Sequence, residues 1–208
     1  MNLKIIHKEG QFIIPFLLCS ILFFLINIRG LLDLSEISYR SNLMIKQPYR
    51  IISYSFAHTD FNHLLSNIFG IVVVRYCFLT LKLKNKYFFL FLTILQILFQ
   101  TLFLFILDNF LIYKHNHLLV GFSGVLFGSY TFIFLSSIFE KKFFLNLFIG
   151  LEKSQDIKKL MILFLFLGVV YSFLPNISLL GHFAGMLSGL IIFFLWRKYL
   201  SSHYKFIN

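Results

Sequence analysis

Four polar side chains in the sequence have the chemical types needed for acyl transfer: Ser123, His182, His63 and Asn67. A serine hydroxyl becomes a useful nucleophile when a neighbouring imidazole accepts its proton, and His182 is the candidate base. The tetrahedral intermediate of such a reaction carries an oxyanion, which positioned N–H donors stabilise. We expect Ser123 and His182 to form a catalytic pair without a carboxylate. The side chains of His63 and Asn67 and the backbone N–H of Ser123 are the candidate oxyanion donors.

Other chemistries find less support in the residue types. All eight acidic residues fall in loops or at the ends of apolar segments, which disfavours an aspartate pair and a proton relay. A zinc site built from His58, His63 and His182 has no carboxylate or cysteine nearby, so we expect neither a metal nor another cofactor. A small transporter that uses His63, Asn67 and His182 as polar ligands in a pore remains an alternative.

The elements that must position these side chains are membrane helices. Of the 208 residues, 59% are hydrophobic and only 13% are charged, whereas a soluble domain has roughly 25% charged residues. A membrane-spanning helix needs about 20 mostly apolar residues. Six segments approach this length: residues 12–28, 61–79, 87–107, 121–139, 160–174 and 178–196. We therefore expect an all-α membrane protein with a bundle of six transmembrane helices.

The distribution of basic residues predicts how the chain is oriented. Of the 19 Lys and Arg residues, 13 fall in the N-terminus, the second loop, the fourth loop and the tail. Basic loops tend to stay in the cytoplasm, so the ends, residues 1–11 and 197–208, are expected there. The net charge of +11 then reflects this bias and attraction to anionic lipid rather than nucleic-acid binding. We treat residues 1–208 as one domain whose first segment is an uncleaved anchor.

This orientation brings the candidate residues to one depth. The second, fourth and sixth segments all run from the outer face inward, so that their beginnings lie near the outer leaflet. His63 and Asn67 begin the second segment, Ser123 begins the fourth, and His182 lies near the start of the sixth. Since His63 and Asn67 are four residues apart, they share one helix face.

Small residues are spaced so that the fourth and sixth segments can pack closely. The pattern consists of glycines on both segments: Gly121, Gly124, Gly128, Gly185 and Gly189. Small residues four apart lie on one side of a helix, which lets two backbones approach each other. We expect this packing to bring the Ser123 hydroxyl within reach of the His182 imidazole.

These residues together resemble the rhomboid family of intramembrane serine proteases. The family's GxSG nucleophile motif is matched by Gly121-Phe122-Ser123-Gly124, and its His-x-x-Gly-x-x-x-Gly motif by His182, Gly185 and Gly189. An aromatic-Arg pair followed by two histidines and an asparagine is matched by Tyr49, Arg50, His58, His63 and Asn67. The matches occur in the family's order and extend over most of the chain.

The resemblance implies roles for individual residues. Ser123 is the implied nucleophile and His182 its base, while His63 and Asn67 line the oxyanion site. Arg50 is implied to anchor the first loop, and we interpret His58 as a residue that structures this loop. Phe127 stands where family members often have tyrosine, and its ring can still pack against the imidazole. His115 and His117 have no counterpart in the family and are interpreted as solvated loop residues.

The resemblance also implies a function. It suggests a bacterial inner-membrane protease that cuts single-span membrane proteins near the outer face. A helical substrate must unwind locally because its carbonyls are hydrogen-bonded within the helix. The short fifth segment is a hypothetical side gate for such substrates. The alternative is a non-catalytic rhomboid-like protein that binds transmembrane helices without cutting them, for which Ser123→Ala would leave function intact.

Overall fold

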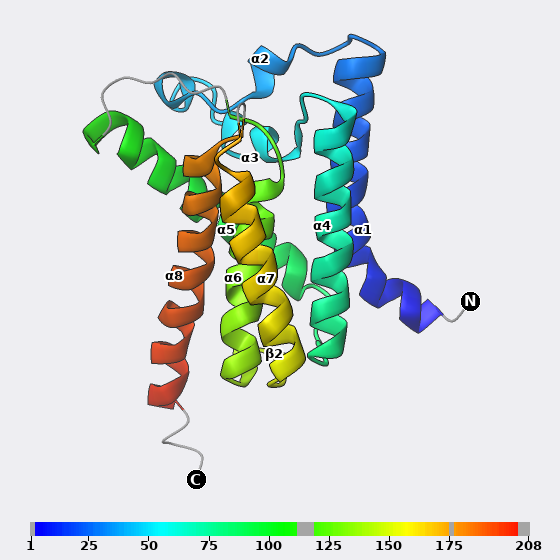
Figure 1. The fold of residues 1–208 in the computed structure, drawn as a ribbon, viewed down its shortest axis with the longest axis vertical. Helices are drawn as coiled ribbons and strands as arrows, with labels where there is room; N and C mark the ends of the chain where they lie inside the picture. The colour runs from blue at the N-terminus through cyan, green and yellow to red at the C-terminus, as the bar shows by residue number, and fades with distance from the viewer. Residues whose placement is uncertain (1–2, 112–118, 175–176, 204–208) are drawn as a thin grey trace.

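The computed structural model describes residues 3–111, 119–174 and 177–203. Within these residues, six helices of 16 or more residues run side by side as a bundle (Figure 1): α1 (Leu3–Phe23), α4 (Phe61–Thr80), α5 (Phe88–Ile106), α6 (Ser123–Ile138), α7 (Gln155–Tyr171) and α8 (Leu179–His203). Single π-helical stretches extend α1 over Phe24–Ile28 and α5 over Leu107–Leu111. The expectation of a mainly helical chain is confirmed.

The number of membrane spans is confirmed only in part. Three helices of the described chain are long and apolar enough to cross a bilayer: Glu9–Ile28, Phe61–Thr80 and Phe88–Phe110. Two shorter apolar stretches, Ser123–Ile138 and Leu179–Leu195, make up α6 and the first part of α8. The length and apolar composition of these helices are those of an integral membrane protein. The number of six spans stays a prediction.

Helix boundaries follow local capping more closely than hydropathy. The Asp60 carboxylate accepts a hydrogen bond from the His63 backbone N–H at 2.9 Å, so α4 begins at Phe61 as predicted. Ser154 caps α7 in the same way, through the N–H of Ile157. This cap starts α7 at Gln155, ahead of several charged residues. Hydropathy alone places the start at position 160, where the apolar segment begins.

The first loop is built from short helical pieces at the end of the bundle where α4 begins (Figure 1). It contains α2 (Leu34–Ile37), α3 (Arg50–Ser53) and the 3-10 turns Ser41–Leu43 and Tyr54–Phe56. The Asn27 side chain donates a hydrogen bond to the His58 carbonyl at 3.0 Å, which ties the end of the loop to α1. The loop is therefore an ordered layer over the site side of the bundle.

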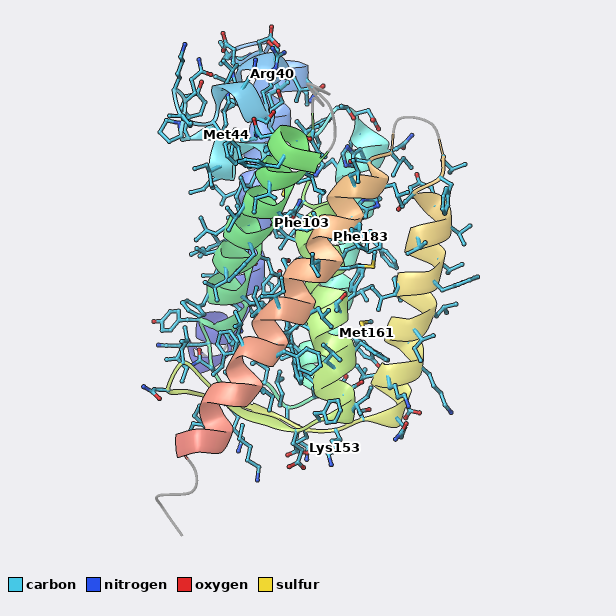
Figure 2. The ribbon with its side chains drawn as sticks, turned by 90° about the vertical axis from the view of Figure 1, so that its left-hand side faces the viewer. Arg40, Met44, Phe103, Lys153, Met161 and Phe183 are labelled. Carbon is cyan, nitrogen blue, oxygen red and sulfur yellow. The ribbon has the colours of Figure 1, made fainter. Side chains whose placement is uncertain are left out.

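A β-hairpin closes the opposite end, where sequence analysis predicts only a loop. Strand β1 (Lys141–Phe144) pairs antiparallel with β2 (Leu147–Leu151), and the turn places Leu145 and Asn146 at positive φ. Phe144, Ile149 and Leu151 are buried against the helices. Figure 2 shows Lys153, just after this hairpin, at the end of the molecule opposite Arg40.

Helix α6 occupies the centre of the bundle. Most of its residues are buried, and it packs against α4, α5, α7 and α8. Figure 2 shows α8 crossing in front of α6, with α5 on one side and α7 on the other. At the upper end, Phe103 of α5 and Phe183 of α8 have ring centroids 6.2 Å apart. A central helix surrounded by others is well placed to present a residue from its first turn to several neighbours.

Candidate active site

Backbone hydrogen bonds from the first loop fix the segment that leads into Ser123. The Gly121 N–H donates to the Tyr54 carbonyl at 2.9 Å, and the Tyr39 N–H donates to the Leu119 carbonyl at 2.9 Å. Helix α6 begins at Ser123, so its backbone N–H lies in the first turn, where helix N–H groups have no partner within the helix. The ordered loop thus positions both the hydroxyl and the N–H of Ser123.

The glycines bring α6 and α8 into backbone contact. A Cβ atom added to Gly185 would overlap the carbonyl oxygen of Gly124, and one added to Gly189 would overlap that of Gly128. The predicted small-residue stripe therefore pairs glycine with glycine at two successive turns. Side chains at the same level on the two helices come within hydrogen-bonding distance as a result.

Ser123 and His182 form a hydrogen bond. The Nε2 atom of His182 lies 2.9 Å from the Oγ atom of Ser123, although the two residues are 59 positions apart in the sequence and lie on different helices. His182 is 6% exposed, while Ser123 is half-buried, so the hydroxyl is the more accessible partner. Phe127, one turn below Ser123, stacks on the imidazole with ring centroids 4.2 Å apart. The pair has the contact that general-base activation of a serine requires.

The second imidazole nitrogen contacts a residue that sequence analysis does not single out. The Nδ1 atom of His182 lies 2.5 Å from the Oγ atom of Ser172, which ends α7. Ser172 is 3% exposed, and its hydroxyl also donates to the Gly168 carbonyl at 2.7 Å. Both ring nitrogens of His182 are therefore hydrogen-bonded to serine hydroxyls.

His63 and Asn67 lie beside the segment that precedes the serine. A Cβ atom added to Gly121 would lie 2.6 Å from His63 Nε2 and 3.8 Å from Asn67 Nδ2. Gly121 has φ +117°, a conformation that favours glycine, so both its backbone and its neighbours exclude a side chain. The Asn67 amide donates to the His63 carbonyl at 3.0 Å, which sets its position on α4.

His58 is buried behind His63. Its Nδ1 lies 3.1 Å from the Phe56 carbonyl, and its ring meets that of His63 edge to face at 4.9 Å. A carbonyl only accepts, so Nδ1 carries the proton. Burial, and secondarily the neighbouring His63, lowers the pKa of His58 to about 3, so this imidazole is neutral at pH 7. Within the described residues, His58 is hydrogen-bonded to the loop and packs on His63 rather than on Ser123 or His182.

Arg50 lies inside the first loop, away from the serine. It is 4% exposed and donates to the carbonyls of Ser35 and Ser38 at 2.9 Å and 2.7 Å, and to the Gln47 side chain. A buried guanidinium satisfied by loop carbonyls holds those turns together. The neighbouring Tyr49 is 52% exposed.

Some of the sequence-based expectations fall outside this cluster. His115 and His117 lie outside the described residues, as does part of the turn between the last two helices. No group of three or more His, Cys, Asp or Glu side chains suited to a metal occurs within the described ranges. What the structure brings together is Ser123, His182, Ser172 and Phe127, with His63 and Asn67 next to Gly121.

Comparison with known families agrees with the motifs. A sequence model of the Rhomboid domain matches residues 46–199, which is most of the chain and includes both Ser123 and His182. No curated protein matches the chain. The matched region extends from the first loop, through the central helix α6, into the last helix. The chain therefore belongs to the rhomboid family of membrane proteins.

Proposed function

We propose that the protein is an intramembrane serine endopeptidase that cuts transmembrane-helix substrates near the outer membrane face. The observation that carries this proposal is the 2.9 Å contact between Ser123 Oγ and His182 Nε2. Membership of the rhomboid family, which includes such proteases, supports the same conclusion. The catalytic residues in this proposal are Ser123 as nucleophile and His182 as general base and acid.

The reaction follows from the positions of these groups. Ser123 Oγ attacks the scissile carbonyl carbon while its proton passes to His182 Nε2. The oxyanion accepts hydrogen bonds from the Ser123 N–H and from the side chains of His63 and Asn67. The imidazolium then protonates the leaving amine, and an acyl group remains on Ser123. Water, deprotonated by the same imidazole, releases the acyl group and regenerates the serine.

The length of α6 supports cleavage below the membrane surface. Its 16 residues rise about 24 Å at about 1.5 Å per residue, which is less than the roughly 30 Å hydrocarbon thickness. If the far end of α6 reaches the cytoplasmic boundary, Ser123 lies several ångströms inside the opposite one. The half-buried hydroxyl is then open to water only from the loop side.

The membrane arrangement is part of the proposal. We propose that all six long helices cross a bacterial inner membrane with both termini in the cytoplasm, which matches the excess of basic residues on that side. The hairpin and Lys153 would then face the cytoplasm, and the first loop would face outward. Cysteine labelling from either side of the membrane, at exposed positions such as Lys142 and Ile45, tests this orientation.

Substrates must reach Ser123 sideways through the bundle. The proposed gate is α7, which contacts α4 through the rings of Phe69 and Phe164, whose centroids are 6.4 Å apart. Its outer face is apolar and exposed, as at Phe166. Bridging Phe69→Cys to Phe164→Cys with a bifunctional reagent, in a chain without its two native cysteines, should block membrane substrates. Unchanged cleavage by the bridged protein would contradict the gate.

The proposed function is tested by cleavage of a single-span substrate in liposomes. Wild-type protein should cut the substrate, while Ser123→Ala and His182→Ala should not. A matched control is Ser137→Ala on the same helix, because the Ser137 hydroxyl donates to the Phe134 carbonyl at 2.6 Å rather than to the imidazole. Cleavage that persists in Ser123→Ala would overturn the proposal.

The competing function is that of a non-catalytic rhomboid-like protein that binds transmembrane helices. It would leave substrate binding intact in Ser123→Ala and show no cleavage in wild type. The hydrogen-bonded Ser–His pair favours the protease, since a binder has no need for an activated hydroxyl. Both functions take single-span membrane proteins and lipid as partners.

A further inference from the structure

Both ring nitrogens of His182 are hydrogen-bonded, and only one of them contacts the nucleophile. Its Nε2 meets Ser123 Oγ at 2.9 Å, while its Nδ1 meets Ser172 Oγ at 2.5 Å. Ser172 comes from α7, a different helix from either member of the pair, and is buried. Among the described residues, no Asp or Glu side chain is hydrogen-bonded to this imidazole, so the serine occupies the position next to Nδ1.

The contacts of Ser172 define the direction of each hydrogen bond. A hydroxyl has a single proton, and the Gly168 carbonyl, 2.7 Å away, can only accept. For that contact to be a hydrogen bond, the Ser172 proton must point to Gly168. Ser172 Oγ can then only accept at His182, so Nδ1 must carry the proton. Nε2 is left with a free electron pair directed at the Ser123 hydroxyl.

We propose that Ser172 is a positioning residue that holds His182 in its Nδ1–H form, with Nε2 as the base. This inference rests on the proposed function for its catalytic consequence. The chain of donors runs from Ser123 to His182, from His182 to Ser172, and from Ser172 to the Gly168 carbonyl. Ser172 supplies by a neutral hydroxyl the orientation that a carboxylate supplies in a three-residue serine hydrolase site.

The chain of bonds also favours the charged intermediate state. When Ser123 attacks, its O–H bond breaks, the proton binds the Nε2 electron pair, and the Nδ1–H bond to Ser172 stays in place. No proton leaves His182 through Ser172. Ser172 lies at the carboxyl end of α7, where the helix carries partial negative charge, which stabilises a nearby imidazolium. Loss of the hydroxyl should therefore lower kcat and leave KM unchanged, since Ser172 is buried and does not contact substrate.

The first experiment compares Ser172→Ala, Ser172→Thr and Ser172→Val. Threonine and valine have nearly the same shape, so any effect of added bulk is common to both and only the hydroxyl differs. We expect kcat to fall roughly 10-fold in Ser172→Ala, the size expected from one lost hydrogen bond. Ser172→Thr should exceed Ser172→Val by a similar factor. Equal activities of Ser172→Ala and wild type would overturn the proposal.

A matched control removes a similar hydroxyl that does not contact the imidazole. Ser188 on α8 is buried, and its hydroxyl donates to the Gly185 carbonyl at 2.7 Å, as Ser172 donates to Gly168. Ser188→Ala should keep the wild-type kcat and KM. A fall in kcat equal to that of Ser172→Ala would assign the effect to general helix packing and contradict a role specific to Ser172.

The second experiment determines which ring nitrogen of His182 carries the proton, without measuring activity. The ring nitrogens of His182 are observed by ¹⁵N NMR of the full chain in detergent, with the His182 signals assigned from a His182→Gln sample. We expect the Nδ1–H form in wild type and a shift toward the Nε2–H form in Ser172→Ala. If the protein cleaves no substrate but the NMR signals still change, the positioning role of Ser172 is supported and the protease proposal is contradicted. An active chain whose His182 signals are the same in both proteins overturns the positioning role alone.

Discussion

The imidazole of His182 lies almost parallel to the phenyl ring of Phe127, with planes 23° apart and centroids at 4.2 Å. The stack restricts rotation of the imidazole while Ser123 and Ser172 hold its two nitrogens. A family-typical tyrosine is absent here, so the apolar ring alone provides the contact. The base of the proposed mechanism is thus fixed by three side chains from two helices other than its own.

Replacement of Phe127 should loosen the base. Aromatic stacking contributes about 0.5–1.5 kcal/mol, so we expect Phe127→Leu to lower kcat by about 2- to 12-fold. The control is Phe132→Leu, since Phe132 is fully buried on the same helix and packs on Phe193 and Phe144 instead. Both variants should lose stability in a thermal melt, but only Phe127→Leu should lose kcat per folded molecule. Equal losses of kcat would contradict a specific role for the stack.

Gly185→Ala should separate α6 from α8. The added methyl group would overlap the Gly124 carbonyl, which is backbone and cannot turn away. We expect a loss of about 1–3 kcal/mol in the free energy of unfolding, and cleavage below one tenth of the wild-type rate. Gly10→Ala is the control, because nothing lies within 4 Å of a methyl group at this helical position. Wild-type activity in Gly185→Ala would show that close helix contact is unnecessary for the pair.

Asn67→Ala tests the oxyanion donors. Removal of one donor typically costs about 3–4 kcal/mol in the transition state, so kcat should fall roughly 100-fold or more while KM changes little. Asn62→Ala, an exposed position on the same helix, should leave both constants unchanged. A rise in KM without a fall in kcat would instead assign Asn67 to substrate binding.

Stability should decrease in mild acid because His58 is buried in its neutral form. Its pKa is about 3 in the folded chain and about 6.5 when exposed, so the unfolded state binds a proton that the folded state does not. Above pH 6.5 this contribution is complete. Below it, the free energy of unfolding should fall by about 1.4 kcal/mol per pH unit from this group.

The measurement is unfolding in mixed detergent micelles between pH 6.5 and 4.5. This window lies above the usual range of Asp60, whose pKa is held low mainly by the His63 backbone N–H. His58→Gln should have lower stability at pH 7 but a flatter slope than wild type. Identical slopes for the two proteins would show that His58 is not the group responsible.

The pair Ser123 and His182 could be located from sequence because spacing and helix direction carry the information. Two apolar segments that run the same way place their first residues at the same depth, whatever the details of packing. The start of α4 could equally be predicted from the sequence, since Asp60 is a strong helix cap. The resemblance to rhomboids, carried by these motifs, is confirmed by the family match.

The contact between Ser172 and His182 could not be predicted from the sequence in the same way. It lies ten positions before His182, and the contact depends on how the chain turns between α7 and α8. A single serine at the end of an apolar helix has no motif of its own. The short separation between the two apolar segments, 160–174 and 178–196, was the one signal in the sequence that could have drawn attention to it, because residues on either side of so short a connection lie near each other.

The β-hairpin and the helix lengths depended on side-chain contacts that hydropathy does not record. Residues 141–151 contain lysine and asparagine among apolar residues, a mixture also typical of loops. Their pairing is fixed by the burial of Phe144 and Ile149 against the helices. Hydropathy also ignores caps, so the first turn of α7 was missed.

Covalent labelling of Ser123 tests the proposed catalytic pair most directly. A fluorophosphonate reacts with an activated serine, and peptide mass spectrometry identifies the modified residue. We expect one adduct on Ser123 in wild type and in Ser137→Ala, and none on this residue in His182→Ala. A Ser123 that stays unmodified in wild type, or that reacts equally well in His182→Ala, would contradict activation of the serine by the histidine.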